Sequence, residues 1–201
     1  MENIIVACVF LVVATFVVIF FKPSKITNYP SLGKTIVMFG DSLTVGVGAS
    51  EGHSIRELIS KKIKEEILGM GVSGQTSGQG LQRIDAVIAL KPKVTLVLFG
   101  GNDYLKKVEK EITFKNIDTI VQKLQRAGSV VILIGIQGGI LSDPFHDEFK
   151  RIAKKRGAVY VTNVLENIIG KEDLMSDQVH PNDKGCEIIA SRIAPILKKV
   201  L

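Results

Sequence analysis

Hydrophobic residues follow two different patterns along this chain. A nearly continuous apolar run, whose single polar residue is Thr15, occupies residues 4–21. After residue 34, short apolar runs alternate with segments in which apolar residues recur every three or four positions. Short apolar runs are typical of buried strands, and the wider spacing is typical of amphipathic helices. The pattern therefore predicts an N-terminal membrane segment followed by an α/β domain.

Strands and helices are expected to alternate through the whole domain. Strands are predicted at residues 35–39, 67–72, 94–99, 129–136 and 159–162. Helices are predicted at residues 54–66, 80–90, 114–127, 144–156 and 183–200. Because the strands are apolar on both faces, we expect a parallel sheet that helices cover on both sides. These elements indicate a flavodoxin-like three-layer sandwich with a five-stranded parallel sheet.

The first apolar run has the length of a transmembrane helix. Its 18 residues would rise about 27 Å at ~1.5 Å per residue, close to the ~30 Å hydrocarbon thickness of a bilayer. A helix of a globular core would have a polar face, and this run has none. A cleaved signal peptide would need small residues at the cleavage site, where this chain has the bulky residues Ile19–Phe21. We expect an uncleaved anchor at residues 1–21, a linker at residues 22–34 and one domain at residues 35–201.

Charge narrows the function classes but leaves the membrane topology open. Lys22 and Lys25 follow the apolar run and Glu2 precedes it, which by the positive-inside rule places the domain in the cytoplasm. This bias is small, so both topologies are kept. The net charge of +6 is scattered, Trp is absent, and no pattern of a nucleic-acid-binding module is present. The chain also has no Walker lysine and no zinc-ligand spacing, so we expect neither metal nor cofactor.

Four polar motifs stand where a parallel α/β sheet binds its ligands. Three follow the carboxyl ends of predicted strands and the fourth precedes the last helix: GDSLT at 40–44, GVSGQTS at 71–77, GGND at 100–103 and DQVHPN at 177–182. Each motif alone is consistent with a turn or a helix cap. Ligands of such sheets lie at the carboxyl ends of the strands, so together the motifs predict a site there.

The order and spacing of these motifs resemble those of the SGNH hydrolases, also called GDSL esterases, across residues 35–201. The second and third motifs are similar to those of the bacterial thioesterase I, lysophospholipase and arylesterase branch. The resemblance implies a serine esterase that acts on carboxylic esters or thioesters. It also implies a domain on the extracytoplasmic side of the membrane.

The resemblance implies a role for each motif. Ser42 matches the nucleophile, His180 the base and Asp177 the residue that orients this base. Gly74 and Asn102 match the oxyanion-hole positions, together with the backbone N–H of Ser42.

Elementary chemistry agrees with these roles. A serine hydroxyl needs a base to become nucleophilic, and histidine serves near neutral pH. Of the three histidines, only His180 is directly followed by a proline, and Asp177 lies three residues before it. His53 and His146 are expected to be surface or capping residues. Asp41 and Asp103 are expected to bind loop backbone.

The substrate is expected to be a lysophospholipid or another acyl ester, because a membrane tether brings the enzyme close to lipids. Candidate substrate-binding residues are Tyr104, Leu105, Ile140 and Leu141, which are apolar and lie beyond strand ends. Two alternatives are a short-chain carbohydrate or peptidoglycan O-acetylesterase and a catalytically silent, membrane-anchored lipid-binding protein. A third is a dinucleotide-binding protein, since residues 69–74 match G-x-G-x-x-G. The oligomeric state stays open.

Overall fold

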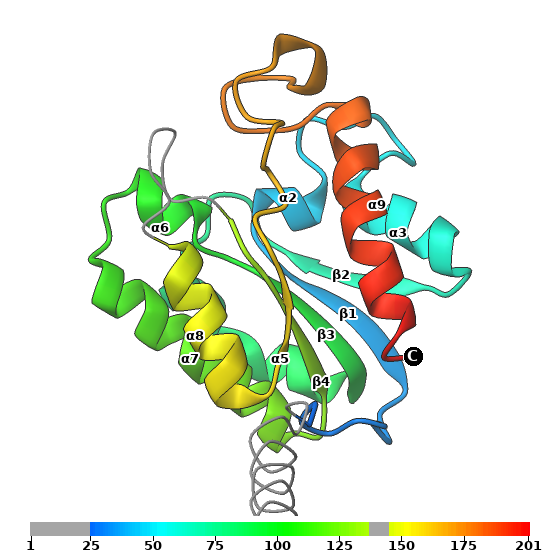
Figure 1. The fold of residues 1–201 in the computed structure, drawn as a ribbon, viewed down its shortest axis with the longest axis vertical. Helices are drawn as coiled ribbons and strands as arrows, with labels where there is room; N and C mark the ends of the chain where they lie inside the picture. Colours follow the sequence, from blue (N-terminus) through cyan, green and yellow to red (C-terminus); the bar gives the residue numbers. More distant parts are fainter. Residues whose placement is uncertain (1–24, 137–144) are drawn as a thin grey trace, which may run out of the picture.

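The computed structural model describes residues 25–136 and 145–201 (Figure 1). Five parallel strands form one sheet in the order β2-β1-β3-β4-β5. The strands are β1 (Thr35–Gly40), β2 (Ile67–Gly71), β3 (Pro92–Leu98), β4 (Val130–Ile134) and β5 (Val159–Val161). The α/β class and the five-stranded parallel sheet are therefore confirmed, and the strand order is that of the flavodoxin-like fold.

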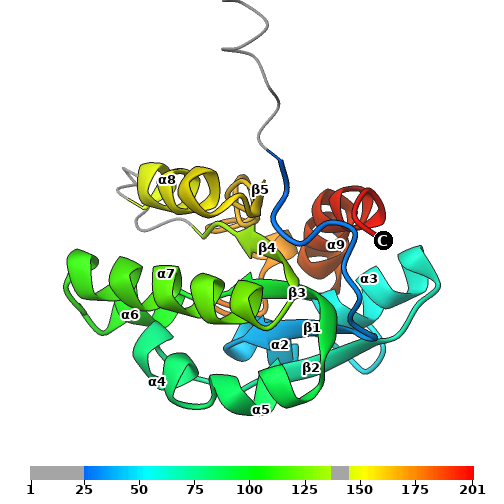
Figure 2. The same cartoon turned by 90° about the horizontal axis from the view of Figure 1, so that it is seen from below.

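Helices cover both faces of the sheet (Figure 2). One face packs against α3 (Ile55–Ile63) and α9 (Asp183–Lys198). The other face is covered by α5 (Ile84–Ala89), α7 (Lys110–Arg126) and α8 (His146–Arg156). The three layers follow from the alternation of strands and helices in the sequence.

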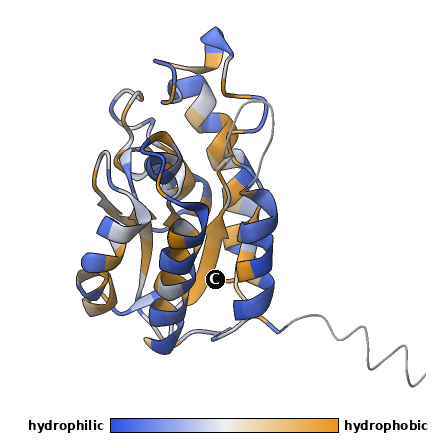
Figure 3. Ribbon diagram, turned by 90° about the vertical axis from the view of Figure 1, so that its left-hand side faces the viewer, coloured by the Kyte–Doolittle hydropathy of each residue, from blue (hydrophilic) through white to orange (hydrophobic). Residues whose placement is uncertain are grey.

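The side chains of the sheet divide between two hydrophobic cores. Along β1, Ile36 and Met38 pack toward α3 and α9, while Val37 and Phe39 pack toward α5 and α7. This division follows from the two-residue repeat of a strand, which sends successive side chains to opposite faces. Figure 3 shows the resulting hydrophobic sheet between helices whose outer faces are hydrophilic.

Short elements depart from the predicted ones. The helix predicted at residues 80–90 is two helices, α4 (Ser77–Gln82) and α5, which meet at Arg83. The first begins earlier than predicted because Thr76 and Gln79 form a capping box. Three further elements were not predicted, since a single turn has no visible periodicity: α2 (Ser42–Val45), α6 (Gly101–Leu105) and the 3₁₀ helix η1 (Glu172–Leu174).

The described part of the predicted linker is docked on the domain. Residues 25–34 form neither helix nor strand, but the Thr27 N–H donates to the Gly157 carbonyl at 2.9 Å and the Lys34 N–H to the Lys91 carbonyl at 2.8 Å. The predicted anchor at residues 4–21 lies outside the described residues. Within residues 25–136 and 145–201, no helix is long and apolar enough to cross a membrane.

Candidate active site

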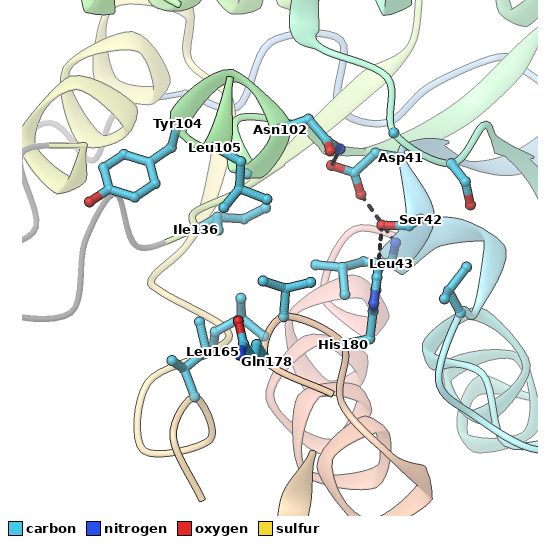
Figure 4. A pocket seen from close by; sticks show the side chains of 16 residues that line it. Asp41, Ser42, Leu43, Asn102, Tyr104, Leu105, Ile136, Leu165, Gln178 and His180 are labelled. Atoms are coloured by element: carbon cyan, nitrogen blue, oxygen red, sulfur yellow. Dashed lines mark hydrogen bonds between the residues drawn. The ribbon is translucent and has the colours of Figure 1, made fainter. Parts of the chain in front are cut away.

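Ser42 lies at the carboxyl end of β1, as the first residue of α2. Asp41 caps this short helix, because its side chain accepts a hydrogen bond from the Leu43 N–H at 3.1 Å. The chain therefore turns directly from strand to helix, and the Ser42 side chain faces the cavity beyond the sheet (Figure 4).

Ser42, His180 and Asp177 form one hydrogen-bonded chain. The Nε2 atom of His180 lies 3.0 Å from the Ser42 Oγ, and its Nδ1 lies 2.7 Å from the Asp177 Oδ2. With a proton on Nδ1, the ring donates to the carboxylate and leaves Nε2 to accept the Ser42 proton. This arrangement can turn the hydroxyl into a nucleophile.

The Asp177 carboxylate is held by its own loop. Its Oδ1 accepts the backbone N–H groups of Val179 and His180, each at 2.8 Å. The hydrogen bond from the His180 ring, followed by these two backbone bonds, lowers the pKa of Asp177 from 3.8 to about 2. Asp177 therefore stays ionised across the whole neutral and mildly acidic range.

Three hydrogen-bond donors can meet a carbonyl oxygen beside Ser42. The Ser42 N–H belongs to the first turn of α2, where backbone donors have no partner within the helix. Gly74 and Asn102 line the same cavity as Ser42. Gly74 has a φ of +74°, a conformation that suits glycine and turns its backbone out of the strand direction. The structure thus brings together the predicted triad and the two predicted oxyanion-hole residues, Gly74 and Asn102.

Asp41 orients the side chain of Asn102. Its Oδ2 accepts a hydrogen bond from the Asn102 Nδ2 at 3.1 Å, which leaves the second N–H of that amide free for a ligand. Asp41 is only 2% exposed. Burial raises the pKa of Asp41 from 3.8 to about 6, although the hydrogen bonds from Leu43 and Asn102 oppose this rise.

Two further contacts hold the loops that carry Gly74 and Asn102. The buried Asp103 accepts both the N–H of Ser77, at 2.8 Å, and its hydroxyl, at 2.6 Å. The Lys106 Nζ donates to the Gly74 carbonyl at 2.6 Å. The role expected for Asp103, binding to a neighbouring loop, describes these contacts, whereas Lys106 has no recognisable signal in the sequence.

Arg83 holds the loop that carries Gly74 by hydrogen bonds to residues around it. Its guanidinium donates to the Gln75 side chain at 2.6 Å, the Met70 carbonyl at 3.0 Å and the Gly40 carbonyl at 2.8 Å. The group also lies 4.6 Å from the centre of the Phe39 ring, a cation–π distance. Sequence reasoning missed Arg83, because it looks like an ordinary polar residue of an amphipathic helix.

A cavity of about 380 Å³ opens beside Ser42, and its walls are mostly apolar. In Figure 4, Tyr104, Leu105 and Ile136 lie on one side of it, with Leu165 on the other. Tyr104 and Leu105 are therefore placed as predicted. The other two predicted wall residues, Ile140 and Leu141, lie outside the described residues. Apolar residues that the sequence did not single out also line the cavity: Leu43, Val47, Ile136, Leu165, Ile169 and Val179.

The other histidines lie away from the cavity. His53 contacts Ser50, with 3.0 Å between its Nδ1 and the serine Oγ. The His146 Nδ1 lies 3.4 Å from the Tyr160 hydroxyl. In the described ranges, no group of three His, Cys, Asp or Glu residues is arranged to hold a metal ion.

This site has the parts of a serine hydrolase, an enzyme that attacks an acyl carbonyl carbon: a serine, a histidine, an aspartate and an oxyanion hole beside an apolar cavity. Comparison with known proteins places the chain more closely. The model of the GDSL-like Lipase/Acylhydrolase family matches residues 38–188, and the chain belongs to this family.

Its relatives are esterases and thioesterases. The chain is 27% identical to Esterase TesA of Pseudomonas aeruginosa over 84% of this chain and 90% of that protein. It is also 27% identical to Thioesterase 1/protease 1/lysophospholipase L1 of Escherichia coli, over 83% of this chain and 85% of that one.

The chain also resembles solved structures of esterases. A crystal structure of TesA superimposes with a TM-score of 0.78 at 26% identity and covers 84% of this chain and 100% of that one. The psychrotrophic esterase EstA from Pseudoalteromonas superimposes with a TM-score of 0.73 at 28% identity, over 82% and 97% of the two chains. The chain is therefore an esterase of the GDSL family.

Proposed function

We propose that the protein hydrolyses medium- or long-chain acyl esters and thioesters, including lysophospholipids, through an acyl-Ser42 intermediate. The observation that carries this proposal is the hydrogen-bonded chain from Ser42 through His180 to Asp177 at the mouth of an apolar cavity. The hydrogen bonds supply the nucleophile and the cavity supplies room for an acyl chain.

In the acylation step, the Ser42 Oγ attacks the substrate carbonyl carbon while His180 Nε2 takes the hydroxyl proton. The oxyanion accepts hydrogen bonds from the backbone N–H groups of Ser42 and Gly74 and from the Asn102 amide. As the intermediate collapses, the bond to the leaving alcohol or thiol breaks, and His180 donates its proton to that group. The acyl group is now esterified to Ser42.

Deacylation repeats these steps with water as the nucleophile. His180 takes a proton from the water, whose oxygen attacks the acyl carbonyl carbon in the same oxyanion hole. Collapse of this second intermediate releases the carboxylic acid and returns the proton to Ser42. Throughout, the ionised Asp177 stabilises the protonated ring and fixes its orientation.

The cavity supports a substrate with an acyl chain of some length. A methylene group takes up about the space of a water molecule, ~30 Å³, so about 380 Å³ can hold roughly a dozen such groups. Apolar walls stabilise a buried chain by about 0.8 kcal/mol per methylene. The relative named Thioesterase 1/protease 1/lysophospholipase L1 supports the same substrate classes.

The test is a profile of hydrolysis against acyl-chain length, from acetyl to palmitoyl, with p-nitrophenyl esters, acyl thioesters and lysophospholipids. The Ser42→Ala variant should remain folded and lose hydrolysis. The Leu105→Trp variant replaces a half-exposed isobutyl side chain of the cavity wall by a bulkier indole ring and should shift the optimum to shorter chains. Ile112→Trp, at a similarly exposed position outside the cavity, is its control. Hydrolysis confined to acetyl esters would instead support a carbohydrate or peptidoglycan O-acetylesterase.

We further propose that residues 4–21 anchor the enzyme in a membrane, with the domain on the extracytoplasmic side. The continuous apolar sequence supports the anchor. Protease accessibility in intact cells compared with spheroplasts tests the side. Digestion only after the cells are broken open would favour the cytoplasmic side, as the charges of Lys22 and Lys25 suggest.

A further inference from the structure

The chain enters the domain at the end opposite the active site. In Figure 1, α2, whose first residue is Ser42, lies near the top of the sheet, whereas the first described residues run beneath the sheet. Three hydrogen bonds join this entering segment to the loops before β5, β4 and β3: Thr27 N–H to Gly157 O, Asn28 Nδ2 to Ser129 O, and Lys34 N–H to Lys91 O. Residues 25–34 are therefore fixed across the amino ends of the strands, and in the sequence only residues 22–24 separate them from the apolar run.

The same end of the domain is strongly basic. Helices of a parallel α/β fold run against the strands, so their carboxyl ends collect at the amino ends of the strands. Basic residues are favoured there by the helix dipole. We define the basic pole as the exposed basic residues of this end: Lys25, Lys34, Lys64, Lys91, Arg126, Lys154, Lys198 and Lys199. Within the described part of the chain, none of them has an ion-pair partner.

Acidic residues at this end do not cancel the positive charge. Glu65 is paired with Lys93, which is not a member of the basic pole, at 2.7 Å. Glu66, the next residue, is exposed and adds a single negative charge. The basic pole thus keeps a clear excess of positive charge on the surface at which the chain enters.

We infer that the basic pole is a docking surface for anionic lipid headgroups. Clusters of about four to eight Lys or Arg residues on the cytoplasmic side of a membrane segment bind anionic lipids, and any leaflet that carries anionic lipid attracts such a cluster by the same electrostatics. Two independent features meet at this surface: its unpaired positive charge, and the fixed position of residues 25–34, which follow the apolar run in the sequence. The bilayer therefore lies against the amino ends of the strands.

This orientation has a consequence for the substrate, which rests on the proposed function. The six residues of β1, which end just before Ser42, advance about 20 Å at ~3.3 Å per strand residue. The active-site cavity, which Ser42 lines, lies at that far end. Docked on its basic pole, the enzyme receives acyl esters that arrive through the aqueous phase, not lipids that enter sideways from its own bilayer.

Lysine footprinting on the full chain tests the docking. The protein is reconstituted into phosphatidylcholine vesicles with or without phosphatidylglycerol, treated briefly with an acetylating reagent, and analysed by mass spectrometry. We expect acetylation of Lys34, Lys91 and Lys198 to be at least about three-fold slower in the anionic vesicles, and the effect to disappear in concentrated salt. Lys107 and Lys184, at the active-site end, should react equally in both.

Matched charge reversals separate docking from a general charge effect. K34E/K91E/R126E should abolish the protection of Lys198, whereas K107E/K171E/K184E should leave it intact. Equal acetylation in both kinds of vesicle would overturn the inference, as would protection of Lys107 and Lys184. Equally slow acetylation of these lysines in detergent without vesicles would also overturn it, because the protection would then not come from lipid.

The footprint needs no turnover, so its result is independent of the esterase proposal. A protected basic pole in a protein that hydrolyses no ester would refute the proposed function alone. Hydrolysis by a protein with an unprotected pole would refute the docking alone. Both charge-reversed variants should keep wild-type activity on a soluble p-nitrophenyl ester.

Discussion

Replacing Asp41 by asparagine should remove a loss of stability that the wild type suffers as the pH rises to neutral, and it should lower the activity. The two carboxylate oxygens of Asp41 accept from different donors, Oδ1 from the Leu43 N–H and Oδ2 from the Asn102 amide, each at 3.1 Å. An asparagine side chain has a single acceptor oxygen. The Asp41→Asn variant must therefore give up one of these bonds, and it carries no charge.

The size of the stability effect follows from the pKa of Asp41. Burial raises this pKa from 3.8 to about 6, and one pKa unit corresponds to about 1.36 kcal/mol. The folded state therefore binds the Asp41 proton more tightly than the unfolded state. The stability gained from this proton is fully present below pH 3.8 and is lost as the pH rises through about 6. The total loss is about 3 kcal/mol.

Asparagine does not titrate, so the unfolding free energy of the variant does not contain the loss caused by ionisation of Asp41. The unfolding free energy of Asp41→Asn minus that of the wild type should rise by about 2 kcal/mol between pH 4 and pH 7. Urea denaturation at one-unit pH intervals measures this difference. Asp118→Asn is a control of opposite sign, because its hydrogen bond with Arg156 lowers the pKa of Asp118. That variant should lose stability relative to the wild type as the pH rises.

The activity of Asp41→Asn should fall because Asn102 loses its fixed orientation. Loss of one oxyanion donor costs about 10²–10³ in kcat, and a misplaced donor should approach the lower figure, with KM little changed. Steady-state hydrolysis of a p-nitrophenyl ester provides this measurement. Parallel stability profiles for variant and wild type, together with full activity, would refute both the titration of Asp41 and its role in holding Asn102.

Three further substitutions test other parts of the molecule. Asp177→Asn should lower kcat by about 10³–10⁴ and leave the thermal unfolding midpoint nearly unchanged; an active variant would exclude Asp177 from the mechanism. Asn102→Ala should lower kcat by about 10²–10³ with a near-constant KM, and equal kcat values would show that the amide does not contact the oxyanion. Gly80→Ala should cost about 1–3 kcal/mol in denaturant unfolding, because the new Cβ would lie 2.4 Å from the Phe99 ring. Gly101→Ala is its control, with no neighbour closer than 4.0 Å; similar losses would contradict this packing argument.

Sequence patterns predicted the sheet well because the signals of its strands are local. Each strand is an apolar run that needs no partner to be recognised, and β1, β3 and β4 lie within two residues of their predicted bounds. The polar site residues could be predicted for a related reason. A parallel sheet brings the carboxyl ends of its strands to one edge, so four separate motifs became one candidate site.

The cavity walls could not be predicted in the same way. Ile136 follows β4, whereas Leu165 and Val179 come from long segments after β5. Apolar residues in such segments look like core residues, and only the folded arrangement shows which of them face Ser42. The docking of residues 25–34 was missed because polar, proline-containing sequence is typical of linkers, and backbone hydrogen bonds leave no mark on composition.

Asp41 and Asp177 differ in burial and change their protonation state at different pH values. Asp41 is buried and begins to gain its proton near pH 6, whereas Asp177 is exposed and keeps its charge to about pH 2. Protonation of Asp41 weakens the acceptor that holds the Asn102 amide, so mild acid acts on the oxyanion hole before it acts on the Asp177 carboxylate. A decline of kcat between pH 7 and pH 4 therefore cannot arise from Asp177. The part of this decline that disappears in Asp41→Asn measures the contribution of the oxyanion hole.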